Sequence, residues 1–270
     1  MMSSVIKEIK YIFSQKSLIN QFTKREILNR YKGSYLGIIW SFVTPLMMLT
    51  IYTFVFSVIF QARWDTNGET SKVEFAFILF TGLFVFNVFS EVVSQAPNLI
   101  IANSNYVKKV VFPLEILPIV ALGSALFQAL ISYLILLVAM LILTGTFYWT
   151  ALLFPIIILP LLLISLGLAW FLASLGVYIR DVGQIVSIVI PALMFMSPIF
   201  YPISSIPKEF QFIYSLNPIT YIVEDMRRAI IWGQLPHWGA VIIELLIGLT
   251  ISILGYIWFK KTRKGFADVL

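Results

Sequence analysis

The chain contains no cysteine and a single histidine, His237. Without cysteine it can form neither a disulfide nor a thiolate metal site, and one histidine excludes a multi-histidine metal site or a histidine relay. Charged residues are also scarce, at 12% of the 270 residues, against ~25% in an average soluble domain. Hydrophobic residues make up 60%. A soluble core of this size cannot enclose so much apolar surface, so lipid must solvate part of it.

Motifs of nucleotide-binding and hydrolytic enzymes are missing as well. There is no G-x-x-x-x-G-K-[ST] phosphate loop, so the chain does not bind ATP by that route. No G-x-S-x-G elbow, H-E-x-x-H motif or paired-carboxylate cluster in a soluble loop is present either. We therefore expect a protein that is not an enzyme, with no catalytic residue, metal or cofactor of its own.

The distribution of basic residues argues against nucleic acid as a partner, although the formal net charge is +6. Seven of the nineteen Lys and Arg residues precede Gly33, and four follow the last apolar run: Lys260, Lys261, Arg263 and Lys264. Positively charged flanks resist translocation across a membrane. This clustering therefore indicates membrane topology rather than a nucleic-acid groove.

The first predicted span covers residues 34–60. From Gly33 to Ala62 there is no charged residue, and ~20 apolar helical residues are enough to cross a bilayer core of ~30 Å. Four basic residues stand just before this run: Lys24, Arg25, Arg30 and Lys32. They mark the cytoplasmic side, so this span runs from inside to outside.

Five further apolar runs complete a prediction of six spans: residues 75–94, 113–143, 151–178, 184–201 and 238–259. The uncharged stretch from Ile116 to Ile179 is too long for one crossing, and TGTFYWT at 144–150 supplies its outer turn. In this topology the cytoplasmic segments hold 14 Lys and Arg residues and the outer segments hold 5. We expect an all-α polytopic membrane protein in which residues 33–260 form the transmembrane domain. Residues 1–32 and the tail 261–270 would both be cytoplasmic.

Three segments outside the spans have predicted structure. Residues 4–18 place apolar side chains at helical spacing, which predicts an amphipathic helix in the inner headgroup layer or a short helix packed on protein. A polar helix over residues 20–32 would lead into the first span. Residues 95–111 predict an inner loop with a short helical stretch and a basic tip at Lys108 and Lys109.

Residues 203–235 are too amphipathic for a clean span. Pro198, Pro202 and Pro207 prevent the fifth helix from continuing. Two short apolar helices broken at Asn217-Pro218 predict a re-entrant outer hairpin, which is allowed only where protein or water covers the broken backbone. The charged residues of this hairpin predict an internal network: Glu224, Asp225, Arg227 and Arg228.

Two acidic residues lie within predicted spans. Glu91 stands near the inner end of the second span, where we expect a packed interfacial carboxylate, because a charge at mid-bilayer would cost ~2.5–3.5 kcal/mol. Glu244 lies below the outer surface in the sixth span. It is either a packing or gate hydrogen-bond partner or the coupling group of an ion-driven carrier.

Aromatic residues make up 16% of the chain. Sugar rings stack on aromatic faces without a fixed charge partner, so a polymer can slide past such faces. The candidate channel-lining aromatics occupy the first and fifth spans: Trp40, Tyr52, Phe56, Phe60, Phe195, Phe200 and Tyr201. The alternative is that they face lipid or fill the core.

Four motifs follow one another in a recognisable order. They are RYKGSYLGIIWSFVTPL, NYVKKVVFPLEILP, SPIFYP and LNPITY followed by Arg227. This order resembles the membrane subunit of type-2 ATP-binding-cassette (ABC) exporters for polysaccharides, which export O-antigen, capsule and teichoic acid. The resemblance covers almost the whole chain.

The resemblance implies a permease of a bacterial cytoplasmic (inner) membrane. It would form a homodimer with two ATPase subunits, in which ATP and Mg would bind, and move an undecaprenyl-diphosphate-linked glycan through its channel. The helix over 20–32 would be the family's gate-type helix. Docking of the ATPase would involve Arg25, Glu26, Arg30, Asn103, Tyr106, Lys108 and Lys109. The outer gate would contain Pro198, Pro202, Asn217, Pro218, Arg227 and Glu244.

Several alternatives stay open at this point. O-antigen is slightly preferred as the polymer, but capsular polysaccharide and teichoic acid fit the same motifs. An ion-coupled secondary transporter is the alternative of another class, and it would work without an ATPase. A membrane-embedded glycan enzyme would need convergent acidic or histidine residues near one interface, and the sequence has none.

Overall fold

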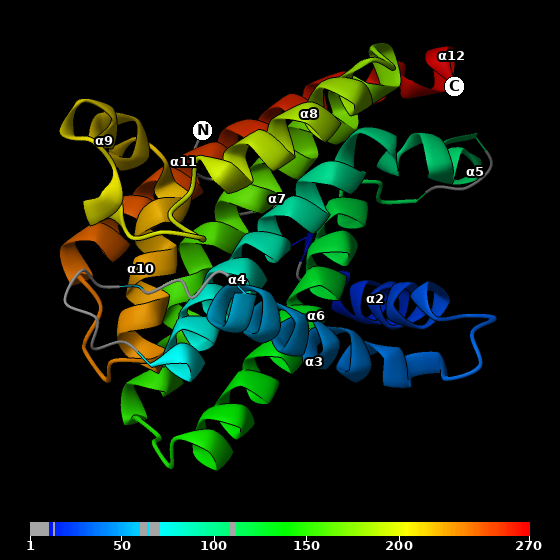
Figure 1. Ribbon diagram of the computed structural model, residues 1–270. Helices are drawn as coiled ribbons and strands as arrows, with labels where there is room; N and C mark the ends of the chain where they lie inside the picture. The colour runs from blue at the N-terminus through cyan, green and yellow to red at the C-terminus, as the bar shows by residue number, and fades with distance from the viewer. Residues whose placement is uncertain (1–10, 13, 60–63, 65–70, 109–111) are drawn as a thin grey trace.

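The computed structural model describes residues 11–12, 14–59, 64, 71–108 and 112–270, with the backbone alone at 56–58. Every regular element within these residues is a helix (Figure 1). The predicted amphipathic helix over 4–18 falls largely outside this part of the chain. The predicted polar helix over 20–32 is present as α2 (Lys16–Arg30), so the all-α prediction holds for what is described.

Five segments among the described residues are long and apolar enough to cross a membrane: Gly37–Val55, Lys72–Leu99, Ile116–Leu143, Trp149–Tyr178 and Trp238–Val269. They contain the helices α3 (Trp40–Tyr52), α4 (Lys72–Leu99), α6 (Ile116–Leu143), α7 (Phe154–Tyr178) and α11 (Trp238–Thr262). Short helical segments extend two of them: η1 (Gly37–Ile39) and the π-helical η2 (Thr53–Ile59) flank α3, and η4 (Trp149–Leu153) precedes α7. These five segments coincide with predicted spans one, two, three, four and six.

The predicted fifth span corresponds to α8 (Val182–Phe195), which has 14 residues and ends six residues before the predicted boundary at 201. Its rise of about 21 Å is less than a bilayer core of ~30 Å. The chain bends after Phe195 because Pro198 cannot continue the hydrogen-bond ladder. The predicted boundary of this span at residue 201 is therefore six residues too late, and a sixth crossing stays a prediction.

The connecting segments are short helices and turns. The loop predicted to be cytoplasmic begins later than residue 95, because α4 continues to Leu99, and it contains η3 (Ile101–Asn103) and α5 (Ser104–Lys108). Three further short elements follow the bend after α8: η5 (Ile203–Ser205), α9 (Lys208–Ser215) and α10 (Pro218–Ile230). The two short helices predicted around Asn217-Pro218 are thus present. After α11 the chain closes with η6 (Arg263–Gly265) and α12 (Phe266–Val269).

Helix α4 forms the centre of the molecule. Of its most hydrophobic stretch, 83% is buried, as expected of a helix that is surrounded by others. It contacts α3, α6, α7, α8 and α10. Helices α7 and α11 cross closely at two glycines: a Cβ atom added to Gly255 would lie 2.1 Å from the carbonyl oxygen of Gly167.

A second, smaller hydrophobic cluster lies at the end of the molecule that carries α5 and α12 (Figure 1). Its buried side chains come from parts of the chain far apart in sequence: Ile100, Phe112, Leu114, Ile116, Leu117, Trp170, Ala173, Val177, Phe259 and Phe266. Phe22 and Tyr106 pack against it. This cluster joins α2, the α5 loop and the last residues of the chain.

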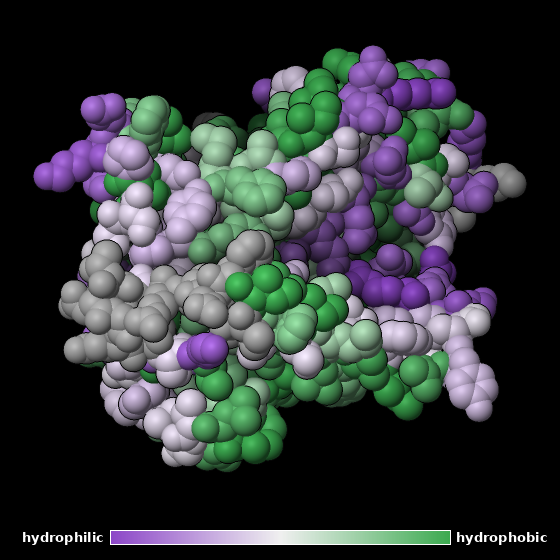
Figure 2. All heavy atoms as spheres, viewed as in Figure 1, coloured by the Kyte–Doolittle hydropathy of each residue, from purple (hydrophilic) through white to green (hydrophobic). Residues whose placement is uncertain are grey.

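Helices α3 and α8 leave apolar faces uncovered. Only 17% of the apolar stretch that contains α3 is buried, and Leu46, Met47 and Ile51 are exposed on it. Ile188 of α8 is 71% exposed. Figure 2 shows hydrophobic surface over both regions. Such faces are covered by lipid or by a second protein surface in a membrane protein.

Candidate functional site

A cavity of about 440 Å³ lies between α4 and the segments α2, α3 and α6 that face it. One side is a polar stripe along α4, formed by Asn87, Ser90, Glu91, Ser94 and Gln95. The spacing of these residues places them on one face of the helix. Figure 2 shows hydrophilic residues gathered in a hollow between the α8 region and the α2–α3 hairpin.

Arg30 and Glu91 form an ion pair at this cavity. Nη1 of Arg30 also lies 3.2 Å from Oε2 of Glu91, and its Nη2 donates to the Ser124 hydroxyl at 3.2 Å. Partial burial lowers the pKa of Arg30, but its hydrogen bond to Glu91 and the charge of Glu91 outweigh this, so the pKa is raised overall. Glu91 is therefore the packed carboxylate that its position predicts, and its partner comes from α2.

Neutral side chains complete the polar wall. The Tyr31 hydroxyl donates to Oε1 of Gln128 at 3.0 Å, and Nε2 of Gln128 donates to the Ser41 carbonyl at 3.0 Å. Sequence reasoning missed Tyr31, Ser124 and Gln128. The signal for Gln128 was its polar amide within a long uncharged run, where polar side chains are costly and often functional.

The far part of the cavity is apolar and aromatic, lined by Met48, Tyr52, Phe80, Leu83 and Phe84. Among the predicted channel aromatics whose side chains the structure describes, Tyr52 borders this cavity. The cavity therefore has a polar, partly charged region and an apolar region along one helix. Such a surface fits a molecule with a polar head and an apolar chain.

The other predicted aromatics lie elsewhere. Trp40 is 36% exposed on the α3 face. Phe195 and Phe200 stack with ring centroids 5.6 Å apart, and the Tyr201 hydroxyl shares a hydrogen bond of 2.7 Å with that of Tyr214. Burial and this bond raise the pKa of Tyr201. Phe60 and the Phe56 side chain lie outside the described residues.

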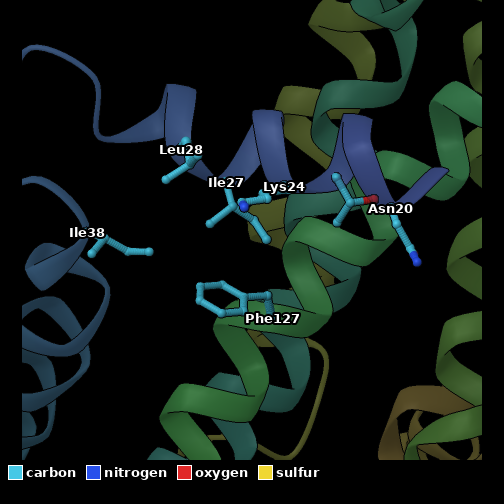
Figure 3. A pocket seen from close by; sticks show the side chains of 7 residues that line it. Asn20, Lys24, Ile27, Leu28, Ile38 and Phe127 are labelled. Atoms are coloured by element: carbon cyan, nitrogen blue, oxygen red, sulfur yellow. The ribbon is translucent and has the colours of Figure 1, made fainter. Parts of the chain in front are cut away.

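A second hollow of about 320 Å³ separates α2 from the beginning of the first span. Figure 3 shows Lys24, Ile27 and Leu28 of α2 facing Ile38 and Phe127 across it. Its walls are mainly apolar, and one cation stands among them. Helix α2 is thus bordered by an open space on the side of η1.

Four of the residues predicted to dock an ATPase lie around the second hydrophobic cluster: Arg25, Asn103, Tyr106 and Lys108. Arg25 donates to the Tyr106 hydroxyl at 3.0 Å and covers the ring of Phe22, with its guanidinium carbon 4.8 Å from the ring centroid. The Asn103 amide donates to the Leu99 carbonyl at 2.9 Å, and Lys108 donates to the carbonyl of Leu270. Glu26 is exposed, Arg30 is at the cavity instead, and Lys109 lies outside the described residues.

Arg227 anchors the predicted outer gate, and it is fully buried. Its guanidinium donates to the carbonyls of Pro198 at 2.6 Å, Ile199 at 2.9 Å and Ile78 at 3.1 Å, and to Glu224 at 2.7 Å. Trp64 lies against its face, 4.3 Å from centroid to guanidinium carbon. Arg227 therefore joins α10 to α4 and to the bend after α8.

The remaining gate residues lie beside this anchor. Oδ1 of Asn217 accepts from the amide of Ile219 at 3.0 Å, and its Nδ2 donates to Ser197 at 2.9 Å, so Asn217 caps α10 and ties it to the bend. Pro218 opens α10, a position that proline favours. Pro202 precedes η5.

The predicted charge network in the hairpin is confirmed. Besides the Arg227–Glu224 pair, Oδ1 of Asp225 accepts from the His237 amide at 3.0 Å and lies 2.8 Å from Nδ1 of that ring. Arg228 is 3.9 Å from the same oxygen. Glu244 of α11 is buried, and its Oε1 has no hydrogen-bond partner among the described residues.

These observations define a multi-pass helical membrane protein with a polar cavity inside its membrane-spanning region. A family model described as "ABC-2 type transporter" matches residues 17–231. The chain belongs to this family, so the resemblance seen in its motifs is confirmed.

Similar proteins carry more specific names. The chain is 26% identical over 262 residues to the "O-antigen export system permease protein RfbA" of Klebsiella pneumoniae, with 96% of each chain covered. It is 26% identical over 276 residues to the Myxococcus xanthus protein of the same name, covering 98% of this chain and 99% of the relative. It is 25% identical over 251 residues to the "Polysialic acid transport protein KpsM" of Escherichia coli, covering 88% of this chain and 93% of the relative.

Proposed function

We propose that this chain is the permease subunit of an ABC exporter that moves a lipid-diphosphate-linked polysaccharide across the cytoplasmic membrane of a bacterium. The observation that carries the proposal is the two-part cavity beside α4 in a chain of this family. The names of its relatives point to polysaccharides as the substrate class. O-antigen is the preferred polymer, with capsular polysaccharide or teichoic acid as alternatives.

The polar stripe of α4 suits a glycan. Asn87, Ser90, Ser94 and Gln95 offer neutral donors and acceptors along one face. Neutral groups bind hydroxyls without the strong fixed attachment that a charge gives, so a polymer can move past them. Tyr52, and the aromatic residues near the bend after α8, would provide stacking surfaces further along the path.

Arg30 suits the diphosphate of a lipid carrier. A guanidinium binds phosphate and carboxylate with the same paired geometry. Arg30 is held by Glu91 at the cavity, so a diphosphate entering there would compete with the carboxylate for the same donors. The apolar region around Met48 and Phe84 would then accept part of the carrier's hydrocarbon chain.

The remaining surfaces fit the other partners that the family resemblance implies. The uncovered faces of α3 and α8 suit contact with a second copy of the chain, and the outward apolar faces suit membrane lipids. The region of Arg25, Glu26, Asn103, Tyr106 and Lys108 suits the ATPase, in which ATP and Mg would bind. In this arrangement both termini are cytoplasmic, and the α9–α10 hairpin is re-entrant at the outer surface.

In the proposed mechanism, ATP binding in the partner subunit is mechanically coupled to movements of this chain. ATP binding in the partner would move the α5 loop and α2, and thereby shift Arg30 relative to Glu91 and α4. Contacts that differ between the two ATPase states are required for such a shift. This chain's residues bind, orient and release the substrate.

A pull-down in mild detergent, followed by an ATPase assay, tests the proposal. The tagged chain should retain an ATPase, and Lys108→Glu combined with Lys109→Glu should lose it because the charge of the docking loop is reversed. Lys261→Glu is the matched control, since this exposed lysine lies outside the predicted docking residues. Loss of the ATPase in the control alone, or its retention in the double variant, would contradict the assignment of the docking loop.

One observation favours a second candidate, an ion-coupled transporter. Glu244 is buried within a spanning helix, and its Oε1 has no hydrogen-bond partner among the described residues, as in carboxylates that carry coupling ions. Transport that needs an ion gradient and no ATPase, and that is lost in Glu244→Gln, would favour this function over the exporter.

A further inference from the structure

We propose that the turn at residues 263–270 is a positioning element for the ATPase-docking surface, because it holds α5 in place from the side opposite α2. The proposal rests on the proposed function, since it concerns the same docking surface. Residues 263–270 were predicted only as a cytoplasmic tail. The structure joins them to the loop that contains Tyr106 and Lys108.

The turn is firmly attached to the membrane-spanning helices. Phe266 has no exposed surface and packs edge-on against Phe259, with ring centroids 5.5 Å apart at 81°. The Tyr178 hydroxyl donates to the Thr262 carbonyl at 2.7 Å. A Cβ atom on Gly265 would lie 2.6 Å from that hydroxyl, so a glycine lets the turn approach α7 this closely.

An ion pair fixes the beginning of the turn. Nη1 of Arg263 lies 2.6 Å from Oε2 of Glu115, a residue that is 6% exposed. The Glu115 carbonyl accepts from the Trp170 indole at 3.0 Å. The turn is therefore joined both to α7 and to the residue that precedes α6.

Helix α5 needs such external support. It has five residues, far below the ~12–15 at which an isolated helix becomes marginally stable in water. On one side Tyr106 stacks on Phe112 at 4.6 Å and accepts from Arg25 of α2. On the other side Lys108 donates to Leu270, and α12 contacts α5 directly (Figure 1).

A docking element transmits movement only if it is held rigidly. Since α5 has little stability of its own, its position depends on the α2 side and on the turn together. Loosening the turn at Phe266 should therefore weaken ATPase docking, although Phe266 is buried and does not itself face a partner. Phe266 is thus a positioning residue in this account.

The experiment places a nitroxide label at Asn105→Cys, an exposed site on α5, in a chain that otherwise contains no cysteine. Label mobility and the amount of co-purified ATPase are measured for the unaltered turn, Phe266→Ala, Phe266→Leu and Asp268→Ala. Asp268 is the matched control because it is exposed on the same helix. Elution as a single species in detergent verifies that each variant folds.

We expect Phe266→Ala to increase label mobility and to weaken ATPase binding about tenfold. Phe266→Leu should keep label mobility and ATPase binding close to those of the unaltered chain, and Asp268→Ala should change neither. Arg263→Gln, which breaks the Arg263–Glu115 pair but leaves Phe266 in place, should give a smaller effect in the same direction. Unchanged label mobility in Phe266→Ala would overturn the proposal, and so would greater mobility with full ATPase retention. Absence of an ATPase from the unaltered chain would instead contradict the proposed function itself.

Discussion

Arg227 and Arg30 differ in their burial and in the partners that their guanidinium groups contact. Arg227 is fully buried and saturated with acceptors, three of them backbone carbonyls. Arg30 has 30% of its side chain exposed and shares its donors between Glu91 and Ser124 at the edge of a cavity. The first arrangement suits a fixed structural joint, and the second suits a group that can exchange its partner.

The joint at Arg227 gives a prediction at the residue scale. Arg227→Lys removes the planar fork that reaches Pro198, Ile199 and Ile78 together, and lysine cannot replace it. Because Glu224 and these carbonyls would then lack donors, the free energy of unfolding should fall by about 3 kcal/mol. A fall in the thermal midpoint of the detergent-solubilised protein measures this loss.

Arg228→Lys is the matched control for this variant, because the neighbouring arginine is partly exposed and its bond to the Leu235 carbonyl is a single one. It should change the midpoint little. Equal effects of the two substitutions would contradict the role assigned to Arg227.

At the scale of elements, much of the helix pattern is predictable from hydropathy. Long apolar runs indicate where α3, α4, α6, α7 and α11 lie, because a helix satisfies the backbone hydrogen bonds that lipid cannot. The predicted fifth span ended at residue 201, whereas α8 already ends at Phe195. Pro198 and Pro202 indicate the region in which this helix stops, but they do not specify its last residue.

The cavity was less predictable, for a physical reason. The periodicity of Asn87, Glu91 and Ser94 places them on one face of α4, but only the folded chain brings Arg30 to that face. The two members of the ion pair are 61 positions apart. The charge network of the hairpin was predictable because its members lie within one turn or two of each other.

The crossing of α7 and α11 gives a prediction for an element. Gly255→Leu should destabilise the protein by about 2 kcal/mol, since added side-chain atoms must push the backbone of Gly167 away. Gly239→Leu in the same helix is the control, because nothing lies within 4 Å of an added Cβ there. Urea or thermal denaturation in detergent, compared between the two variants, measures the difference; equal stability would contradict the close crossing.

At the scale of the whole molecule, the two ends differ in construction. One end joins α2, the α5 loop and the last residues through a separate hydrophobic cluster. The other joins α10, α4 and the bend after α8 through Arg227. Helix α4 connects both ends and carries the polar stripe between them. In the exporter that we propose, this connection would couple the ATPase side to the opposite end of the molecule.

ATP-driven transport by the reconstituted complex tests the central claim most directly. The chain and its co-purified ATPase would be placed in vesicles with a lipid-diphosphate-linked O-antigen polysaccharide, and movement of the glycan across the bilayer would be followed with an impermeant glycosidase. The account predicts that the accessibility of the glycan to the glycosidase changes only when ATP and Mg are supplied on the ATPase side. The rate of this change should be lower in Arg30→Gln. Glycan movement that is independent of ATP and requires an ion gradient would contradict the proposed ATP-driven export.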